Sequence, residues 1–235
     1  MIEVPHKLKC SKCGNPPQIY YRPAGRYFCR KCFIRFIETK VSAGLPGSGD
    51  LYIILPICSL TPLISRVARK RRLRTRGTLL IRPKSVSVPH SVLTEFENPE
   101  VVLTRDESEV PCVECFTVAT SLRKLGSWHV LGFTAEMLSY VLIASVLTCS
   151  LELMRKLLKV DSRGIVLPLS KLRSEDIVMY NRALEYPVVM CTALNKSIVT
   201  KFIKEEEMKT PTLHFSTLTS MRVLMKYLRP ILKSL

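Results

Sequence analysis

Short apolar runs alternate with longer segments of helical periodicity along residues 51–190. The runs are rich in leucine and β-branched residues and predict strands, whereas apolar side chains three or four positions apart predict helices. Strands that alternate with helices predict an α/β domain with a parallel sheet and crossover helices. The predicted strands are 51–55, 78–81, 101–104, 130–132 and 187–190, and the predicted helices are 60–72, 114–125, 135–158, 174–184, 197–208 and 221–228.

The segment Ala135–Leu158 is predicted to be one buried helix, because apolar residues cover nearly every face through most of its length. Its longest uncharged run is shorter than the roughly 18–20 residues that a membrane span requires, so no membrane partner is expected. Thr134 is the predicted N-cap of this helix, and Ser174 is the predicted N-cap of the next one. We also expect Cys58 and Cys149 to be buried.

The stretch 42–50, SAGLPGSGD, is rich in glycine, serine and proline and predicts a linker. We therefore divide the chain into residues 1–42, a metal-binding module that ends in a helix over Arg30–Val41, and residues 51–235, the α/β domain. The composition of 47% apolar and 23% charged residues is typical of a chain that buries a core. The N-terminus has no apolar secretory segment, and we expect a cytoplasmic protein.

Two CxxC pairs, Cys10 with Cys13 and Cys29 with Cys32, are separated by fifteen residues. Each pair directs two thiolates to one point, and two pairs complete a closed tetrahedral zinc site. A rubredoxin-like iron site with the same ligands is an alternative, and four free thiols are another. A closed four-thiolate site leaves no open position, so we assign it no catalysis.

Basic residues are concentrated near the N-terminus. Residues 1–90 hold 18 of the 36 Lys and Arg but only 3 of the 19 Asp and Glu, in a chain of net charge +17. Seven of the eleven residues in 66–76 are cationic, without an acid in the run, which favours binding to phosphate groups. A solvated helix face or a nuclear signal would also explain the run. The candidates for RNA contact are Arg22, Arg26, Arg66, Arg69, Lys70, Arg71, Arg72, Arg74 and Arg76.

Two segments carry a family resemblance. Residues 10–41, CSKCGNPPQIYYRPAGRYFCRKCFIRFIETKV, resemble the N-terminal zinc module of tRNA thiolation proteins. Residues 112–147 and 165–189, with the pattern PL...L...E..MYNRAL.YP, most resemble the cytoplasmic tRNA 2-thiolation protein 2 family, the non-catalytic partner of a PP-loop tRNA thiolase. The resemblance implies a zinc module on a degenerate PP-loop (adenine nucleotide alpha-hydrolase-like) domain.

Both nucleotide motifs of the catalytic relatives are altered in this chain. Where they carry SGGxDS after the first strand, this chain has PICSLT at 56–61, without glycine. Pro56 has no N–H to donate, and β-branched Ile57 resists the positive φ of a phosphate-binding loop. Where they carry GHNxDD, the acidic pair is reduced to Glu136. We therefore expect a pseudoenzyme that does not bind ATP.

The resemblance also aligns Cys112, Cys115 and Cys191 with cysteines that hold an iron–sulfur cluster or form sulfur-transfer intermediates in catalytic relatives. A three-thiolate cluster with one open iron could bind sulfide. The alternative interpretation is that the first two are an unligated remnant and that Cys191 belongs to the core.

The sequence thus predicts a non-catalytic subunit for 2-thiolation of the wobble uridine of tRNA, which binds tRNA and pairs with a catalytic thiolase of related fold as a heterodimer. The resemblance also allows a ubiquitin-like sulfur carrier as a partner. One rival hypothesis is an active ATP-dependent tRNA sulfurtransferase that uses Cys112, Cys115 and Cys191. The other is a zinc-ribbon nucleic-acid-binding regulator.

Overall fold

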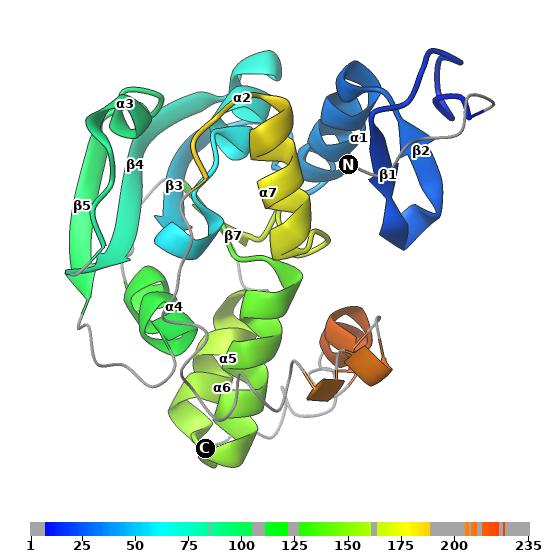
Figure 1. Cartoon of the computed structure of the whole chain (residues 1–235). Helices are drawn as coiled ribbons and strands as arrows, with labels where there is room; N and C mark the ends of the chain where they lie inside the picture. The colour runs from blue at the N-terminus through cyan, green and yellow to red at the C-terminus, as the bar shows by residue number, and fades with distance from the viewer. Residues whose placement is uncertain are drawn as a thin grey trace.

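The computed structural model describes residues 8–84, 86–104, 111–121, 127–160 and 164–188, together with 205–206, 208–210, 213–220 and 223. A five-stranded sheet lies between two layers of helices, and a two-stranded antiparallel hairpin lies beside one of these layers (Figure 1). All four strand pairs of the larger sheet are parallel. The predicted parallel α/β architecture is confirmed.

The sheet has the strand order β5-β4-β3-β6-β7, with β3 at its centre. Both faces of β3 are covered by helices, so its side chains are apolar on both: Leu51, Ile53 and Leu55 enter one core cluster, and Tyr52 and Ile54 enter the other. The strand bounds are β3 Asp50–Pro56, β4 Arg74–Pro83, β5 Pro99–Thr104, β6 Trp128–Leu131 and β7 Ile165–Val166.

Two groups of helices cover the two faces of the sheet. The first face carries α1 Arg30–Ser42, α2 Leu63–Lys70, α3 His90–Leu93 and α7 Ser174–Ala183. The second face carries α4 Pro111–Ser121, α5 Ala135–Leu147 and α6 Leu151–Val160. Within the described part of the chain, no helix has the length and apolar character needed to cross a membrane.

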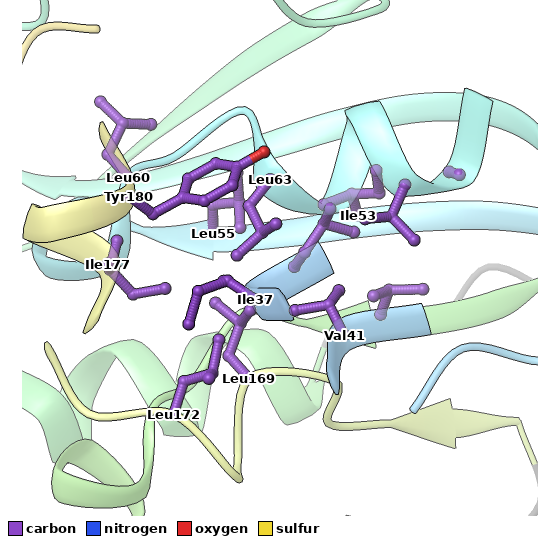
Figure 2. Close-up of a cluster of buried hydrophobic side chains, with 14 of the residues drawn as sticks. Ile37, Val41, Ile53, Leu55, Leu60, Leu63, Leu169, Leu172, Ile177 and Tyr180 are labelled. Atoms are coloured by element: carbon purple, nitrogen blue, oxygen red, sulfur yellow. The ribbon is translucent and has the colours of Figure 1, made fainter. Parts of the chain in front are cut away.

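Helix α1, which follows the metal-binding cysteines, contributes directly to the core above the sheet. Ile37 and Val41 of α1 are fully buried and lie among side chains of β3, α2 and α7, including Leu55 and Tyr180 (Figure 2). The segment 42–50 therefore connects two parts that share one hydrophobic cluster.

Glu38 of α1 is a carboxylate that is only 7% exposed. It accepts a hydrogen bond from the Tyr180 hydroxyl of α7 at 3.1 Å, and it forms ion pairs with Lys70 at 2.5 Å and Arg66 at 3.8 Å, both on α2. A buried carboxylate needs such partners because burial removes its hydration. Glu38 thus links three helices at one point.

The predicted single helix 135–158 is wrong, because the chain breaks it into α5 and α6. Cys149 adopts a positive φ of 48° between them and is exposed rather than buried. Polar groups satisfy the broken ends: the Thr148 hydroxyl donates to the carbonyl of Ala144, and the Ser150 hydroxyl accepts from the N–H of Leu153. Such local hydrogen bonds compete with continuous helix.

Smaller differences concern caps and ends. Thr134 caps α5 as predicted, accepting from the N–H of Met137 at 3.4 Å. Ser174 is not the cap of α7: Arg173 takes that position, and its N–H donates to the Asp176 carboxylate at 2.9 Å. No strand forms at 187–188, while 189–190 and Met221–Leu228, apart from residue 223, lie outside the described residues. The same holds for 197–204 and for the Cys58 side chain.

We predict that Glu38→Ala lowers the free energy of unfolding by about 1–3 kcal/mol, because it leaves the buried Tyr180 hydroxyl without its acceptor. Glu38→Gln retains an acceptor and should cost less. Lys70→Ala is the matched control, since the Lys70 side chain is 58% exposed and its ion pair contributes less than about 1 kcal/mol. Urea unfolding measures all three. Equal losses for Glu38→Ala and Lys70→Ala would contradict the central role of Glu38.

Candidate metal centre and nucleic-acid interface

The metal-binding module consists of a hairpin packed on α1. Strands β1 Ile19–Tyr21 and β2 Arg26–Phe28 pair in antiparallel register around the turn Arg22–Ala24, which Gly25 closes with a φ of 58°. The inner face of the hairpin meets α1 through buried and partly buried aromatic rings whose centroids lie 5.1–6.5 Å apart. These rings are Tyr21, Phe28, Phe33 and Phe36.

The structure brings the four N-terminal cysteines together. Cys10 and Cys13 come from the turn before β1, Cys29 is the N-cap of α1, and Cys32 lies in its first turn. Their sulfur atoms all lie within 4.8 Å of one another, and the Cys13 and Cys29 sulfurs are 3.6 Å apart. Tetrahedral zinc with Zn–S bonds of about 2.3 Å separates its sulfurs by about 3.8 Å. The donor set fits a structural zinc ion, and iron uses the same tetrahedral thiolates.

The local electrostatics favour a cation at this site. Burial opposes ionisation of Cys10, but the backbone N–H groups of Cys29, Lys12 and Cys13 outweigh it and lower the pKa of the Cys10 thiol to about 6. Hydrogen bonding with the Cys13 and Cys29 sulfurs raises the pKa of Cys32 to about 12. Ionisation of all four adjacent sulfurs is therefore opposed without a cation, and a divalent metal would supply the compensating charge.

The module is also tied to α7 by polar contacts. The Tyr21 hydroxyl donates to Asp176 at 3.1 Å and accepts from Lys40 at 3.0 Å. Burial raises the pKa of Asp176 and lowers the pKa of Lys40, which reflects how little water reaches this contact. Arg30 donates to the carbonyl of Ala183 and forms an ion pair at 2.8 Å with Glu185 just beyond α7.

The basic run 66–76 covers α2 and the turn into β4. The sequence suggested that this run has no compensating acid, but the fold supplies acids from other segments. Arg66 and Lys70 pair with Glu38, and Arg76 pairs with Asp50 at 2.5 Å. These three cations therefore have structural partners, which weakens their assignment to RNA contact.

Arg71 is likewise held in place, because its guanidinium donates to the carbonyls of Ser42 and Leu45 at 2.8 and 3.2 Å. The remaining three side chains are exposed and form no ion pair within the described part of the chain: Arg69, Arg72 and Arg74. Arg72 has a positive φ of 57° in the turn after α2.

A second basic surface lies on the hairpin. Arg22 and Arg26 are exposed at its turn, next to the cross-strand pair Tyr20 and Tyr27, whose ring centroids are 4.7 Å apart. Tyr20 is 50% exposed, on the side away from the aromatic core. An exposed ring beside two arginines can stack on a base while the cations contact phosphate.

The segment after β3, where a nucleotide loop would lie, is closed and buried. It forms the turn Ile57–Ser59, and the Ser59 hydroxyl donates to the carbonyl of Gly132. Thr61 donates to the Asn181 side chain at 2.7 Å, and the Asn181 amide donates to the carbonyl of Leu60 at 3.0 Å. Sequence reasoning missed this role of Asn181, although the MYNRAL pattern that signals it was recognised.

Glu136, at the position of the second nucleotide motif, is engaged internally. Its carboxylate accepts from the N–H of Ser174 at 3.0 Å and lies 3.5 Å from the Arg173 guanidinium. It therefore joins the starts of α5 and α7.

The second cysteine group is only partly described. Cys112 and Cys115 lie in the first turns of α4, and Cys191 lies outside the described residues, as does the side chain of Cys112. Cys115 is 3% exposed, and burial raises the pKa of its thiol to about 12. A cluster at these three cysteines stays a prediction.

We predict that the purified protein contains about one zinc ion per chain and that Cys29→Ser releases it, because metal binding energy is folding energy in so small a module. Cys149→Ser is the matched control, since Cys149 is an exposed thiol far from the metal-binding group in the chain. Elemental analysis and thermal unfolding measure both variants. Full zinc retention in Cys29→Ser would overturn the assignment.

Comparisons with known proteins agree with this geometry. Residues 9–34 match the family model described as "2-thiouridine synthetase TtuA, N-terminal LIM domain". This match covers the hairpin and all four metal-binding cysteines. No curated protein sequence matches the chain.

Among solved structures, the U34-tRNA thiolase NcsA from Methanococcus maripaludis, determined with its [4Fe-4S] cluster, is similar with a TM-score of 0.65. The alignment covers 93% of this chain and 88% of that one, at 15% sequence identity. At this identity the likeness establishes the fold. The chain therefore combines a four-cysteine metal module with the α/β fold of a PP-loop thiolase.

Proposed function

We propose that this chain is a non-catalytic, RNA-binding subunit of a complex that 2-thiolates the wobble uridine of tRNA. In this proposal an ATP-dependent thiolase of the same fold activates the nucleotide, and this chain supplies tRNA contacts and the heterodimer interface. The likeness to a U34-tRNA thiolase and the TtuA-type module support tRNA as the substrate class. They support a catalytic sulfurtransferase about as well.

The closed segment after β3 is the observation that favours the non-catalytic alternative. A nucleotide loop must point several backbone N–H groups at phosphate. Here Ser59 and Thr61 are at most 1% exposed. Their hydroxyls donate hydrogen bonds to the carbonyl of Gly132 and to the side chain of Asn181. Opening this segment for a nucleotide would break those hydrogen bonds and uncover Ile57 and Leu60. These buried hydrogen bonds support the proposal that the chain does not bind ATP.

The catalytic alternative draws on a different observation, the [4Fe-4S] cluster in the structurally similar thiolase. Cys112 and Cys115 would contribute two thiolates from α4 and Cys191 a third. Burial raises the pKa of the Cys115 thiol in the metal-free chain, and iron binding would deprotonate it.

Binding to tRNA should weaken steeply with salt, because bound cations release counterions from phosphates. We predict that neutralising Arg69, Arg72 and Arg74 to glutamine weakens binding and flattens the salt dependence. The matched control neutralises three exposed cations elsewhere: Lys84, Arg155 and Lys171. Fluorescence anisotropy over a salt series measures both triple variants. The same salt dependence of tRNA affinity in both triple variants would mean that the basic run is only a solvated face.

The isolated chain should show no saturable ATP binding in the micromolar range by calorimetry. In a complex reconstituted with the catalytic subunit, Ser59→Ala should leave thiolation unchanged, whereas altering the nucleotide loop of the partner should abolish it. Circular dichroism would show that the Ser59 variant is folded. Tight ATP binding by this chain alone, lost in Ser59→Ala, would favour the catalytic sulfurtransferase instead.

A further inference from the structure

A cavity of about 730 Å³ lies between α1 and α2, beside the metal centre. Its lining includes the metal-binding Cys29, apolar side chains from both helices at Ile34 and Val67, and a ring of charged groups. It is an open groove on the surface rather than an enclosed cavity, and its volume lies in the range of ligand sites. Neither the metal centre nor the closed segment after β3 accounts for it.

The charge of this cavity has one dominant sign. Among the residues that the structure describes, five cationic side chains and one carboxylate line it. The carboxylate, Glu38, is already neutralised by Lys70 and holds the Tyr180 hydroxyl. The lining cations are Arg30, Lys31, Arg35, Lys70 and Arg71.

Two of these cations have neither an ion pair nor a side-chain hydrogen bond in the described part of the chain. Arg30 forms an ion pair with Glu185 beyond α7, and Lys70 forms one with Glu38. Arg71 donates hydrogen bonds to backbone carbonyls. Lys31 and Arg35 are exposed, and neither forms an ion pair with any residue that the structure describes. They lie four residues apart on α1, so their Cβ atoms are about 5–6 Å apart on one wall of the cavity.

We propose that this α1–α2 groove binds the phosphate backbone of an RNA strand, with Lys31 and Arg35 as the contacting cations. Three further exposed arginines lie close in sequence to the groove-lining Lys70 and Arg71 of the α2 side: Arg69, Arg72 and Arg74. Several neighbouring cations suit the regular charges of a phosphodiester chain. The proposal rests on the proposed function only for naming tRNA as that RNA.

The test reverses the charge of Lys31 and Arg35 in the full chain. Lys31→Glu with Arg35→Glu lowers the net charge from +17 to +13, and Arg155→Glu with Lys171→Glu on other surfaces is the matched control of equal charge. Binding of a tRNA transcript and of a short oligouridine is measured by anisotropy over a salt series. Polyaspartate and inorganic phosphate serve as competitors, and zinc content and thermal unfolding report on the fold.

We expect the groove variant alone to bind both RNAs more weakly and to reduce the salt slope for oligouridine by about 1.4, the value for two lost phosphate contacts on a single strand. Its zinc content and unfolding temperature should match those of the control. Equal slopes in the two variants would overturn the proposal. If polyaspartate displaces RNA at the same concentration as oligouridine, the proposal is overturned in favour of an acidic protein partner. If inorganic phosphate displaces RNA at that concentration, the proposal is overturned in favour of a small-anion site.

The two RNAs separate this proposal from the proposed function. The wild-type chain could bind tRNA no more tightly than oligouridine while the groove variant loses oligouridine binding. That result would support the RNA-binding groove and contradict the tRNA-thiolation role. If tRNA binds tightly and equally to the groove variant and the control variant, the result supports the tRNA role and contradicts the RNA-binding groove.

Discussion

Helix α1 is the element on which the rest of the structure depends, because it contributes residues both to the metal centre and to the core above the sheet. Its N-terminus supplies Cys29 and Cys32 to the metal centre, and its buried face, with Ile37 and Val41, fills the core above the sheet. Glu38, between these positions, fixes α1 to α2 and α7. Metal binding and sheet packing are therefore coupled through a single helix, and the basic surfaces on α1 and α2 keep a fixed relation to each other.

Within this PP-loop thiolase fold, the segment after β3 is closed by contacts with α7. Asn181 of α7 ties down Leu60 and Thr61, and Arg173 at the start of α7 faces Glu136. Helix α7 thus holds the segment after β3 and the start of α5 in place by hydrogen bonds and an ion pair. Under the proposed function, the surface chemistry that remains is that of RNA binding by arginine and lysine.

The sequence predicted those features that depend on local pattern. The two CxxC pairs, the alternation of strands and helices, and the Thr134 cap follow from residues close in the chain. The break at Cys149 was missed because an apolar pattern does not reveal competing hydrogen bonds from Thr148 and Ser150. Strand β7 was missed because two residues carry no periodicity. The ion pairs of the basic run were missed because Glu38 and Asp50 approach it only in the folded chain.

The coupling through α1 is tested most directly by hydrogen–deuterium exchange of the full chain with and without a zinc chelator. We expect metal removal to speed exchange in the hairpin and also in β3, whose Ile53 and Leu55 share a buried cluster with α1. Faster exchange confined to the hairpin and the first turn of α1, with β3 unchanged, would contradict this coupling.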